Sequence, residues 1–110
     1  MPFLIVAFDH PDLEAQREAI RAAHRAHLAS LGDRLLASGA LLADDGATII
    51  GGASLVDTED EEEARRFERE DPYAKAGIRE SVQVIHWRLR WWCGEFQAGG
   101  WRPSSRKTLP

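Results

Sequence analysis

The chain has 110 residues, of which 44% are hydrophobic and 29% charged, a balance that predicts one globular domain with a modest core. Residues 1–87 carry nine basic and 17 acidic side chains, and such an acidic body argues against nucleic-acid binding. A single cysteine, no apolar run long enough to span a bilayer and no signal-peptide pattern at the start together predict a cytoplasmic protein without a membrane partner.

The first two elements are predicted to be a strand and a long helix. Residues 3–8 are continuously apolar, which favours a strand buried on both faces. Pro11 suits the first turn of a helix, and Glu14 lies near the positive end of its dipole. We expect this helix to run to about Leu31, where Gly32 closes it.

A hairpin should follow. Residues 34–42 and 48–56 are apolar runs separated by a turn that contains Asp45-Gly46, a strong short-range hairpin signal. Gly51-Gly52 inside the second run indicates a bulge or a close approach to the backbone.

A second helix is predicted to begin at Asp57 or Thr58, with acidic residues in its first turn and arginines later, as the helix dipole favours. It should end at Asp71-Pro72, because proline pushes the residue before it out of the helical region.

The last predicted strand covers residues 79–92. Its alternation changes phase at Val84-Ile85, which predicts either a bulge there or a strand covered on both sides. Residues 94–110 show no periodicity and are expected to form a tail that orders only against a neighbour, so the domain itself should be residues 1–93.

The element order is therefore β-α-β-β-α-β, which predicts an α+β fold of the ferredoxin-like split βαβ type, with an antiparallel sheet and both helices on one face. Large apolar side chains fall on both faces of this sheet. Because one chain cannot cover both faces, we expect a homodimer or a higher homo-oligomer that packs sheet to sheet.

Two histidines of the first helix are candidates for chemistry. At about 100° per residue, His27 and His24 flank Ile20 on the core-facing side. Asp71 is the candidate partner of His27, because a carboxylate that accepts from one imidazole nitrogen fixes the tautomer and leaves the other nitrogen free for proton transfer. A structural core histidine and a metal site made by both histidines with Asp71 are the alternatives.

These residues resemble the YCII-related (YciI-like) family. The resemblance rests on His27-Leu28-x-x-Leu31, on Gly39-Ala40-Leu41-Leu42-x-Asp44-Asp45-Gly46, on Gly52-Ala53-Ser54-Leu55-Val56, on Asp71-Pro72-Tyr73-Ala74-Lys75-Ala76-Gly77, and on Glu80-Ser81-Val82-x-Val84-x-x-Trp87. It covers about residues 3–92 and implies a dimeric α+β barrel with a site built on His27 and Asp71.

The chain departs from the family pattern at two places. Ala40 stands where the family usually has proline, and His24 stands where it usually has arginine. We therefore expect His24 or Arg25 to bind substrate, with Tyr73 beside them. A few relatives act on chlorinated aromatic intermediates, so the resemblance implies a lyase, isomerase or dehydrochlorinase with a small polar or aromatic substrate, general acid/base chemistry and no cofactor or metal. The alternative is a non-catalytic ligand-binding or accessory dimer.

Overall fold

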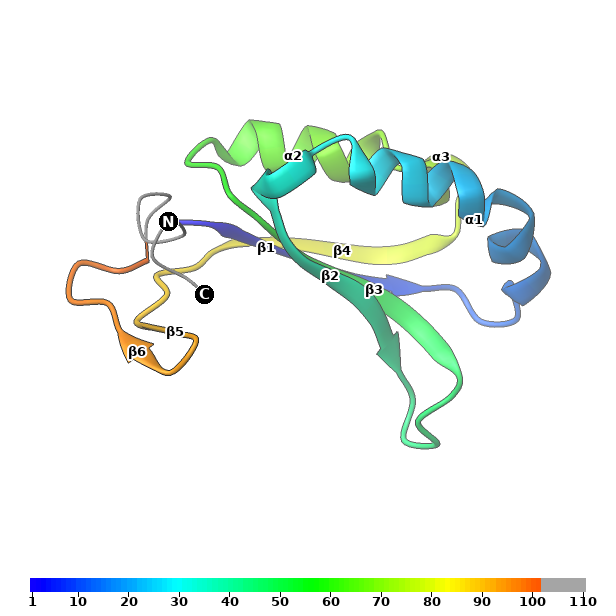
Figure 1. Cartoon of the computed structure of the whole chain (residues 1–110). Helices are drawn as coiled ribbons and strands as arrows, with labels where there is room; N and C mark the ends of the chain where they lie inside the picture. The colour runs from blue at the N-terminus through cyan, green and yellow to red at the C-terminus, as the bar shows by residue number, and fades with distance from the viewer. Residues whose placement is uncertain (102–110) are drawn as a thin grey trace.

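The computed structural model describes residues 1–101 as a four-stranded sheet with helices on one face and a small separate hairpin at one end (Figure 1). The elements in chain order are β1 (Phe3–Asp9), α1 (Glu14–Ala29), the 3-10 turn η1 (Gly32–Arg34), β2 (Leu35–Leu42), β3 (Ile49–Val56), α2 (Glu61–Arg69), α3 (Pro72–Lys75), β4 (Arg79–His86), β5 (Trp91–Trp92) and β6 (Glu95–Phe96).

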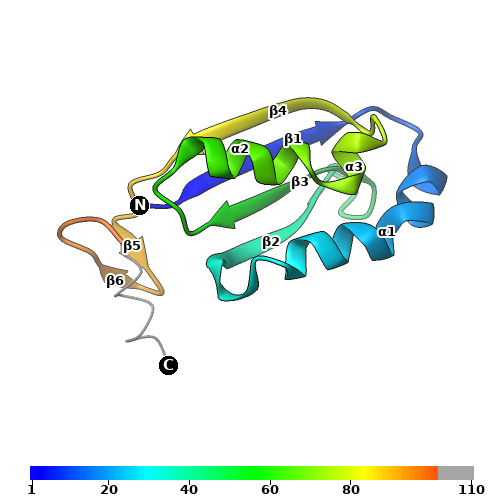
Figure 2. The ribbon, with the colours of Figure 1, turned by 90° about the horizontal axis from the view of Figure 1, so that it is seen from above.

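The sheet has the order β2-β3-β1-β4, and every neighbouring pair is antiparallel. The two halves of the βαβ pattern thus interleave, with β1 and β3 in the centre. Seen from above, α1 lies along the β2 side and α2 lies over β1 and β4 (Figure 2). The predicted α+β fold of the ferredoxin-like type is confirmed.

The main core lies between the sheet and the helices. Phe3 and Ile5 of β1 point to this side and pack with Val56 of β3 and with Ala64 and Phe67 of α2. The charged remainder of α2 stays outside, where Glu61 pairs with Arg65 at 2.7 Å. Helix α2 thus presents Phe67 to the core and its charged side chains to solvent.

Several predicted boundaries shift. The first helix begins at Glu14 rather than Pro11, because Asp12 has a positive φ of 63° that no helix accommodates. Asp60, not Asp57 or Thr58, caps α2, and its carboxylate accepts the Glu62 N–H at 3.0 Å.

The prediction of a single long last strand is also wrong. Strand β4 ends at His86 rather than at residue 92. Its register against β1 is continuous through Val84 and Ile85, so the predicted bulge is absent there, and the shift falls instead between Phe8 and Asp9. The phase change has another cause: Val84 packs under the helices, whereas Ile85 is exposed on the opposite face.

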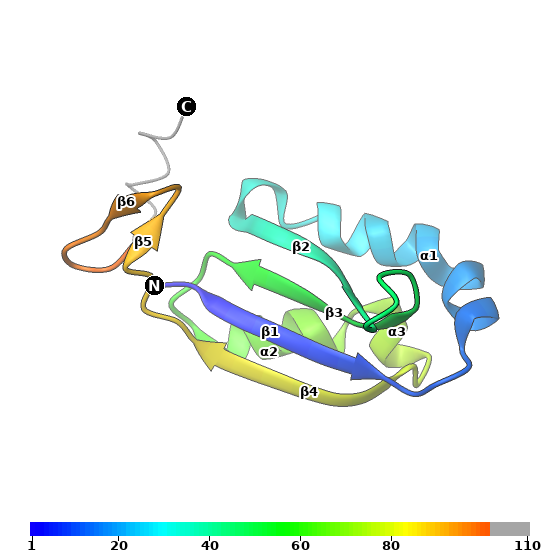
Figure 3. The ribbon, with the colours of Figure 1, turned by 90° about the horizontal axis from the view of Figure 1, so that it is seen from below.

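The segment after residue 93 has more structure than predicted. Strands β5 and β6 form a hairpin beside one end of the sheet (Figure 3). Trp101 is fully buried and packs with Leu89 and Leu55. Residues 94–101 therefore order against their own chain. The rest of the predicted tail, 102–110, lies outside the described residues.

Gly51 is predicted to be irreplaceable in β3. A Cβ at this position would lie 2.0 Å from the Ala7 carbonyl oxygen of β1, so the close backbone approach expected at Gly51-Gly52 is confirmed. Gly51→Ala must push two central strands apart, and we expect a loss of about 3 kcal/mol in the free energy of unfolding, measured by urea titration. Gly39→Ala is the control, because its Cβ would meet no atom within 4 Å. Equal stability of the two variants would contradict the prediction.

Within residues 1–101, none of the helices combines the length and the apolar character that crossing a membrane requires.

Candidate active site

A cavity of about 380 Å³ lies between α1 and the sheet. Its roof is one face of α1, and its floor is formed by small residues of β2 and β3. From α1 it is lined by Arg17, Arg21, His24, Arg25 and Leu28, and from β2 and β3 by Ser38, Gly39, Ala40, Ile49, Gly51, Gly52, Ala53 and Ser54. Ile5, Asp9, Glu68, Tyr73 and Arg79 complete the wall. Polar groups therefore converge on a hollow large enough for a small molecule.

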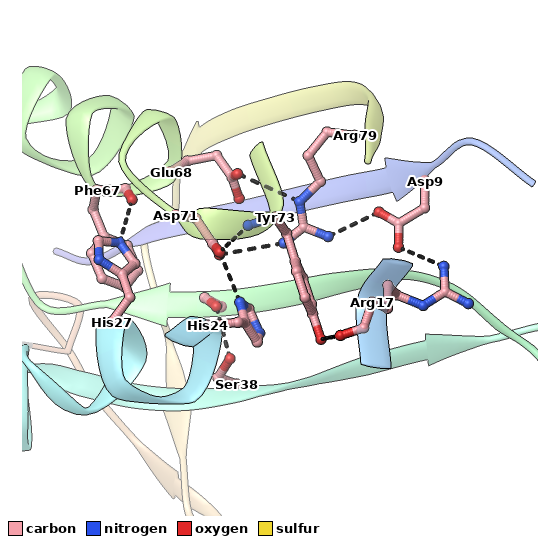
Figure 4. A network of polar contacts seen from close by, with 11 residues as sticks. Asp9, Arg17, His24, His27, Ser38, Phe67, Glu68, Asp71, Tyr73 and Arg79 are labelled. Atoms are coloured by element: carbon pink, nitrogen blue, oxygen red, sulfur yellow. Dashed lines mark hydrogen bonds and ion pairs between the residues drawn. The ribbon is translucent and has the colours of Figure 1, made fainter. Parts of the chain in front are cut away.

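His24 is the imidazole that pairs with Asp71. Its Nδ1 lies 2.8 Å from Oδ1 of Asp71, and its ring stacks on Tyr73 with the centroids 3.9 Å apart (Figure 4). A carboxylate only accepts hydrogen bonds, so Nδ1 carries the proton in this contact. The other ring nitrogen, Nε2, has no hydrogen-bond partner among residues 1–101, and His24 lines the cavity.

The sequence around Asp71 explains why its carboxylate is held so firmly. Pro72 begins the short helix α3, and Asp71 is its N-cap in an extended conformation. Oδ1 of Asp71 accepts the Tyr73 N–H at 2.9 Å in addition to the contact with His24. The prediction that Pro72 keeps Asp71 out of the helical region is confirmed.

A buried charge network surrounds this pair. Arg79, the first residue of β4, donates to Asp9 at 2.9 Å and lies 3.5 Å from both Glu68 and Asp71. Its guanidinium also lies over the Tyr73 ring, 5.4 Å from the centroid. Arg17 donates to the other oxygen of Asp9 at 3.3 Å. All of these side chains are visible in Figure 4.

The network shifts the pKa values of Asp71 and Glu68 in opposite directions. Burial acts to raise the pKa of Asp71, but the hydrogen bonds from His24 and from the Tyr73 N–H, with the charge of Arg79, outweigh it and leave that pKa lowered. For Glu68 burial dominates and the charge of Asp71 adds to it, so the pKa is raised despite Arg79. Asp71 is thus kept ionised beside His24.

The predicted pairing of Asp71 with His27 is wrong. His27 lies one turn further along α1, and its Nε2 donates to the Phe67 carbonyl of α2 at 2.7 Å while its ring stacks on the Phe67 ring. The Phe67 carbonyl belongs to the last turn of α2, where no helical N–H is available to it. His27 therefore ties α1 to the end of α2, and it does not line the cavity.

We expect His27→Ala to lower stability without lowering any activity of the cavity. The variant leaves the Phe67 carbonyl without its donor, which should cost about 1–3 kcal/mol in urea unfolding. His10→Ala is a suitable control, because His10 is exposed and its ring lies 4.0 Å from Glu80, beyond hydrogen-bond distance. This substitution should change the free energy of unfolding by less than about 0.5 kcal/mol. A His27→Ala protein as stable as the control would contradict the structural role.

The other predicted site residues, Arg25 and Tyr73, both line the cavity with His24. Their predicted role in substrate binding stays a prediction. Arg21, a further cavity residue, is held by Glu18 at 2.5 Å, whereas Arg25 has no carboxylate partner among the described residues.

Sequence reasoning missed Asp9, Arg17, Glu68 and Arg79. A signal existed for one pair only: Asp9 ends β1 and Arg79 begins β4, so opposite charges face each other once the antiparallel register is known. Within residues 1–101 no group of three or more His, Cys, Asp or Glu side chains is arranged to hold a metal ion.

Fold and cavity together define a small α+β protein with a polar cavity beneath its first helix. The model of the YCII-related domain matches residues 1–88, and the chain belongs to this family. A similar solved structure is that of 5-chloro-2-hydroxyhydroquinone dehydrochlorinase (TftG) from Burkholderia phenoliruptrix AC1100 in complex with 2,5-dihydroxybenzoquinone. It is 30% identical, with a TM-score of 0.72, over 81% of this chain and 95% of that chain. Comparison with curated proteins gave no match.

Proposed function

We propose that the protein is a small cytoplasmic enzyme in which the His24-Asp71 pair carries out general acid/base chemistry on a hydroxylated aromatic compound. The observation that carries the proposal is the 2.8 Å contact of Nδ1 with a buried carboxylate while His24 lines the cavity. Asp71 orients the ring and stabilises the imidazolium that forms when Nε2 takes up a proton.

The reaction type that fits best is loss of HCl from a chlorinated hydroxyquinol, by analogy with the activity of TftG. His24 Nε2 accepts the proton of a ring hydroxyl and returns it to the carbon that bears chlorine. The chloride then leaves with the electron pair of the carbon–chlorine bond as a second hydroxyl loses its proton. The product is a hydroxybenzoquinone plus HCl, so atoms and electrons balance without an added oxidant.

The arginines of the cavity support an anionic or electron-rich substrate. Arg25 lines the cavity without a carboxylate partner among residues 1–101, so its guanidinium is available to a phenolate or enolate oxygen. Arg79, in contrast, is held by Asp9 and Glu68 and serves the framework. We propose Arg25 and Tyr73 as substrate contacts beside the catalytic His24.

Incubation with 5-chloro-2-hydroxyhydroquinone, followed by chloride release and quinone absorbance, tests the activity. We expect His24→Gln to lower kcat by about 10²- to 10⁴-fold, because it removes the proton-transfer group. His27→Gln keeps the cavity intact and is the matched control on the same helix. A loss of the same size in both variants, or chloride release unaffected by His24→Gln, would refute the assignment.

We also propose that the protein acts as a homodimer that pairs through the open sheet face. Phe8, Ile85 and Trp87 are 42%, 46% and 42% exposed, and isolated chains rarely leave large side chains of one sheet so accessible. Sedimentation equilibrium should give twice the monomer mass, and Ile85→Glu should shift the protein to monomer.

A further inference from the structure

The floor of the cavity carries a second polar feature, a pair of serine hydroxyls on neighbouring strands. We infer that the Ser38-Ser54 pair is an oxygen-binding subsite, so that the cavity selects a planar ring with two oxygen substituents, one at His24 and one at the serines. This inference rests on the proposed function and names the substrate feature that the floor recognises.

The position of the pair follows from the sheet register. Ser38 of β2 faces Ser54 of β3 directly, and Ser54 in turn faces Ile5 of β1, whose side chain lies on the helix side of the sheet. The two Oγ atoms are 2.8 Å apart, and both residues line the cavity beneath α1. In Figure 4 Ser38 lies on the strand side of the site, with His24 above it on the helix.

The hydrogen-bonding capacity of the pair is incomplete. Each hydroxyl has one proton to donate, and their mutual contact uses only one of the two. The second O–H has no acceptor among residues 1–101, since neither serine has a further partner there. The pair therefore presents one donor and unused lone pairs to the cavity, which suits a phenol, enol or quinone oxygen.

The surrounding floor favours a flat ligand. Next to the serines the cavity is bounded by Gly39, Ala40, Gly52 and Ala53, whose side chains extend no further than Cβ. A Cβ on Gly52 would lie 3.5 Å from the Gly39 carbonyl oxygen and 3.9 Å from the Arg79 guanidinium nitrogens, so the floor at this position lies within contact distance of the charge network. A ring can thus lie along the strands with its edge oxygens directed at the polar groups.

A cross-strand serine pair also occurs in sheets without any ligand, as an ordinary pair that stabilises the strands. The two roles differ in what they predict. Loss of a purely structural pair lowers the free energy of unfolding and changes the affinity for all ligands to the same degree. An oxygen subsite affects binding, and only the binding of rings that carry a second oxygen.

The test compares two ring probes on full-length protein by NMR chemical-shift titration. One is 2,5-dihydroxybenzoquinone, and the other is phenol, whose single oxygen is expected at His24. The variant is Ser38→Ala with Ser54→Ala, and the control is Ser81→Ala, an exposed strand serine outside the cavity. Thermal melting confirms that each variant is folded.

For the double variant we expect the Kd of 2,5-dihydroxybenzoquinone to rise about tenfold, the loss of roughly one hydrogen bond, with the Kd of phenol unchanged. Equal effects on both probes, or no effect on either, would overturn the subsite. If the wild-type protein binds neither ring, the subsite and the proposed substrate class are both overturned. A selective effect in a protein that releases no chloride supports the subsite and refutes only the proposed reaction.

Discussion

Arg79→Met is expected to destabilise the fold more than any other substitution of a charged residue considered for this protein, by about 3–5 kcal/mol. Arg79 is the shared cation of Asp9, Glu68 and Asp71, and its side chain is only 10% exposed. Methionine fills a similar volume but removes the cation that the three carboxylates share, so that only Asp9 keeps an arginine partner, Arg17. Removing one partner of a buried ion pair costs far more than removing an exposed one, because the remaining charge stays out of water.

Urea titration at pH 7 measures the effect, with Arg69→Met as the matched control. Arg69 pairs with Glu62 at 2.5 Å, but both side chains are more than half exposed, so its loss should cost no more than about 1 kcal/mol. Equal losses in the two variants would show that the Arg79 network contributes no more than a surface pair.

The pH dependence of the Arg79→Met protein follows from the same network. Without the guanidinium, the pKa of Glu68 should rise further above its ordinary 4.5, because Arg79 is the main influence that lowers it. A carboxyl whose folded pKa is raised contributes its stability below the unfolded pKa and loses it as the pH rises through the folded pKa. The deficit of the variant should therefore shrink between pH 7 and pH 5.

The element order was predictable because each element carries a local signal. The apolar run at residues 3–8, the turn at Asp45-Gly46 and the stop at Asp71-Pro72 specify strand, hairpin and helix end without tertiary information. The end of β4 at His86 was not predictable. Trp91 and Trp92 continue the apolar pattern, yet they form a separate hairpin that meets the sheet only through tertiary contacts.

The site was half predictable for a similar reason. Proline fixes the backbone at Asp71, so its direction is a local property, whereas the choice between His24 and His27 depends on how α1 is placed over α2 and α3. The two histidines are three residues apart and lie on nearly the same side of the helix. Only the tertiary contacts decide that His27 meets the Phe67 carbonyl and His24 meets Asp71.

Asp71→Asn is expected to lower kcat for HCl elimination by about 10²- to 10⁴-fold while the protein stays folded. The amide oxygen can still accept the Tyr73 N–H, so the cap of α3 is kept. The negative charge that stabilises a protonated His24 is lost, although an amide oxygen in the place of Oδ1 can still accept from His24 Nδ1 as well as from the Tyr73 N–H. Steady-state kinetics should show the loss in kcat rather than in KM.

The change in the free energy of unfolding at acid pH distinguishes this electrostatic role of Asp71 from a merely structural one. The pKa of Asp71 in the folded protein lies below its ordinary 3.8. The ionised carboxylate therefore adds to the free energy of unfolding of the wild-type protein above pH 3.8, and this stabilisation is lost as the pH falls through the folded pKa. The Asp71→Asn protein has no such group, so its stability should fall less steeply below about pH 4. An unchanged acid limb in Asp71→Asn, together with normal kcat, would show that the carboxylate neither holds His24 nor contributes its charge to the reaction.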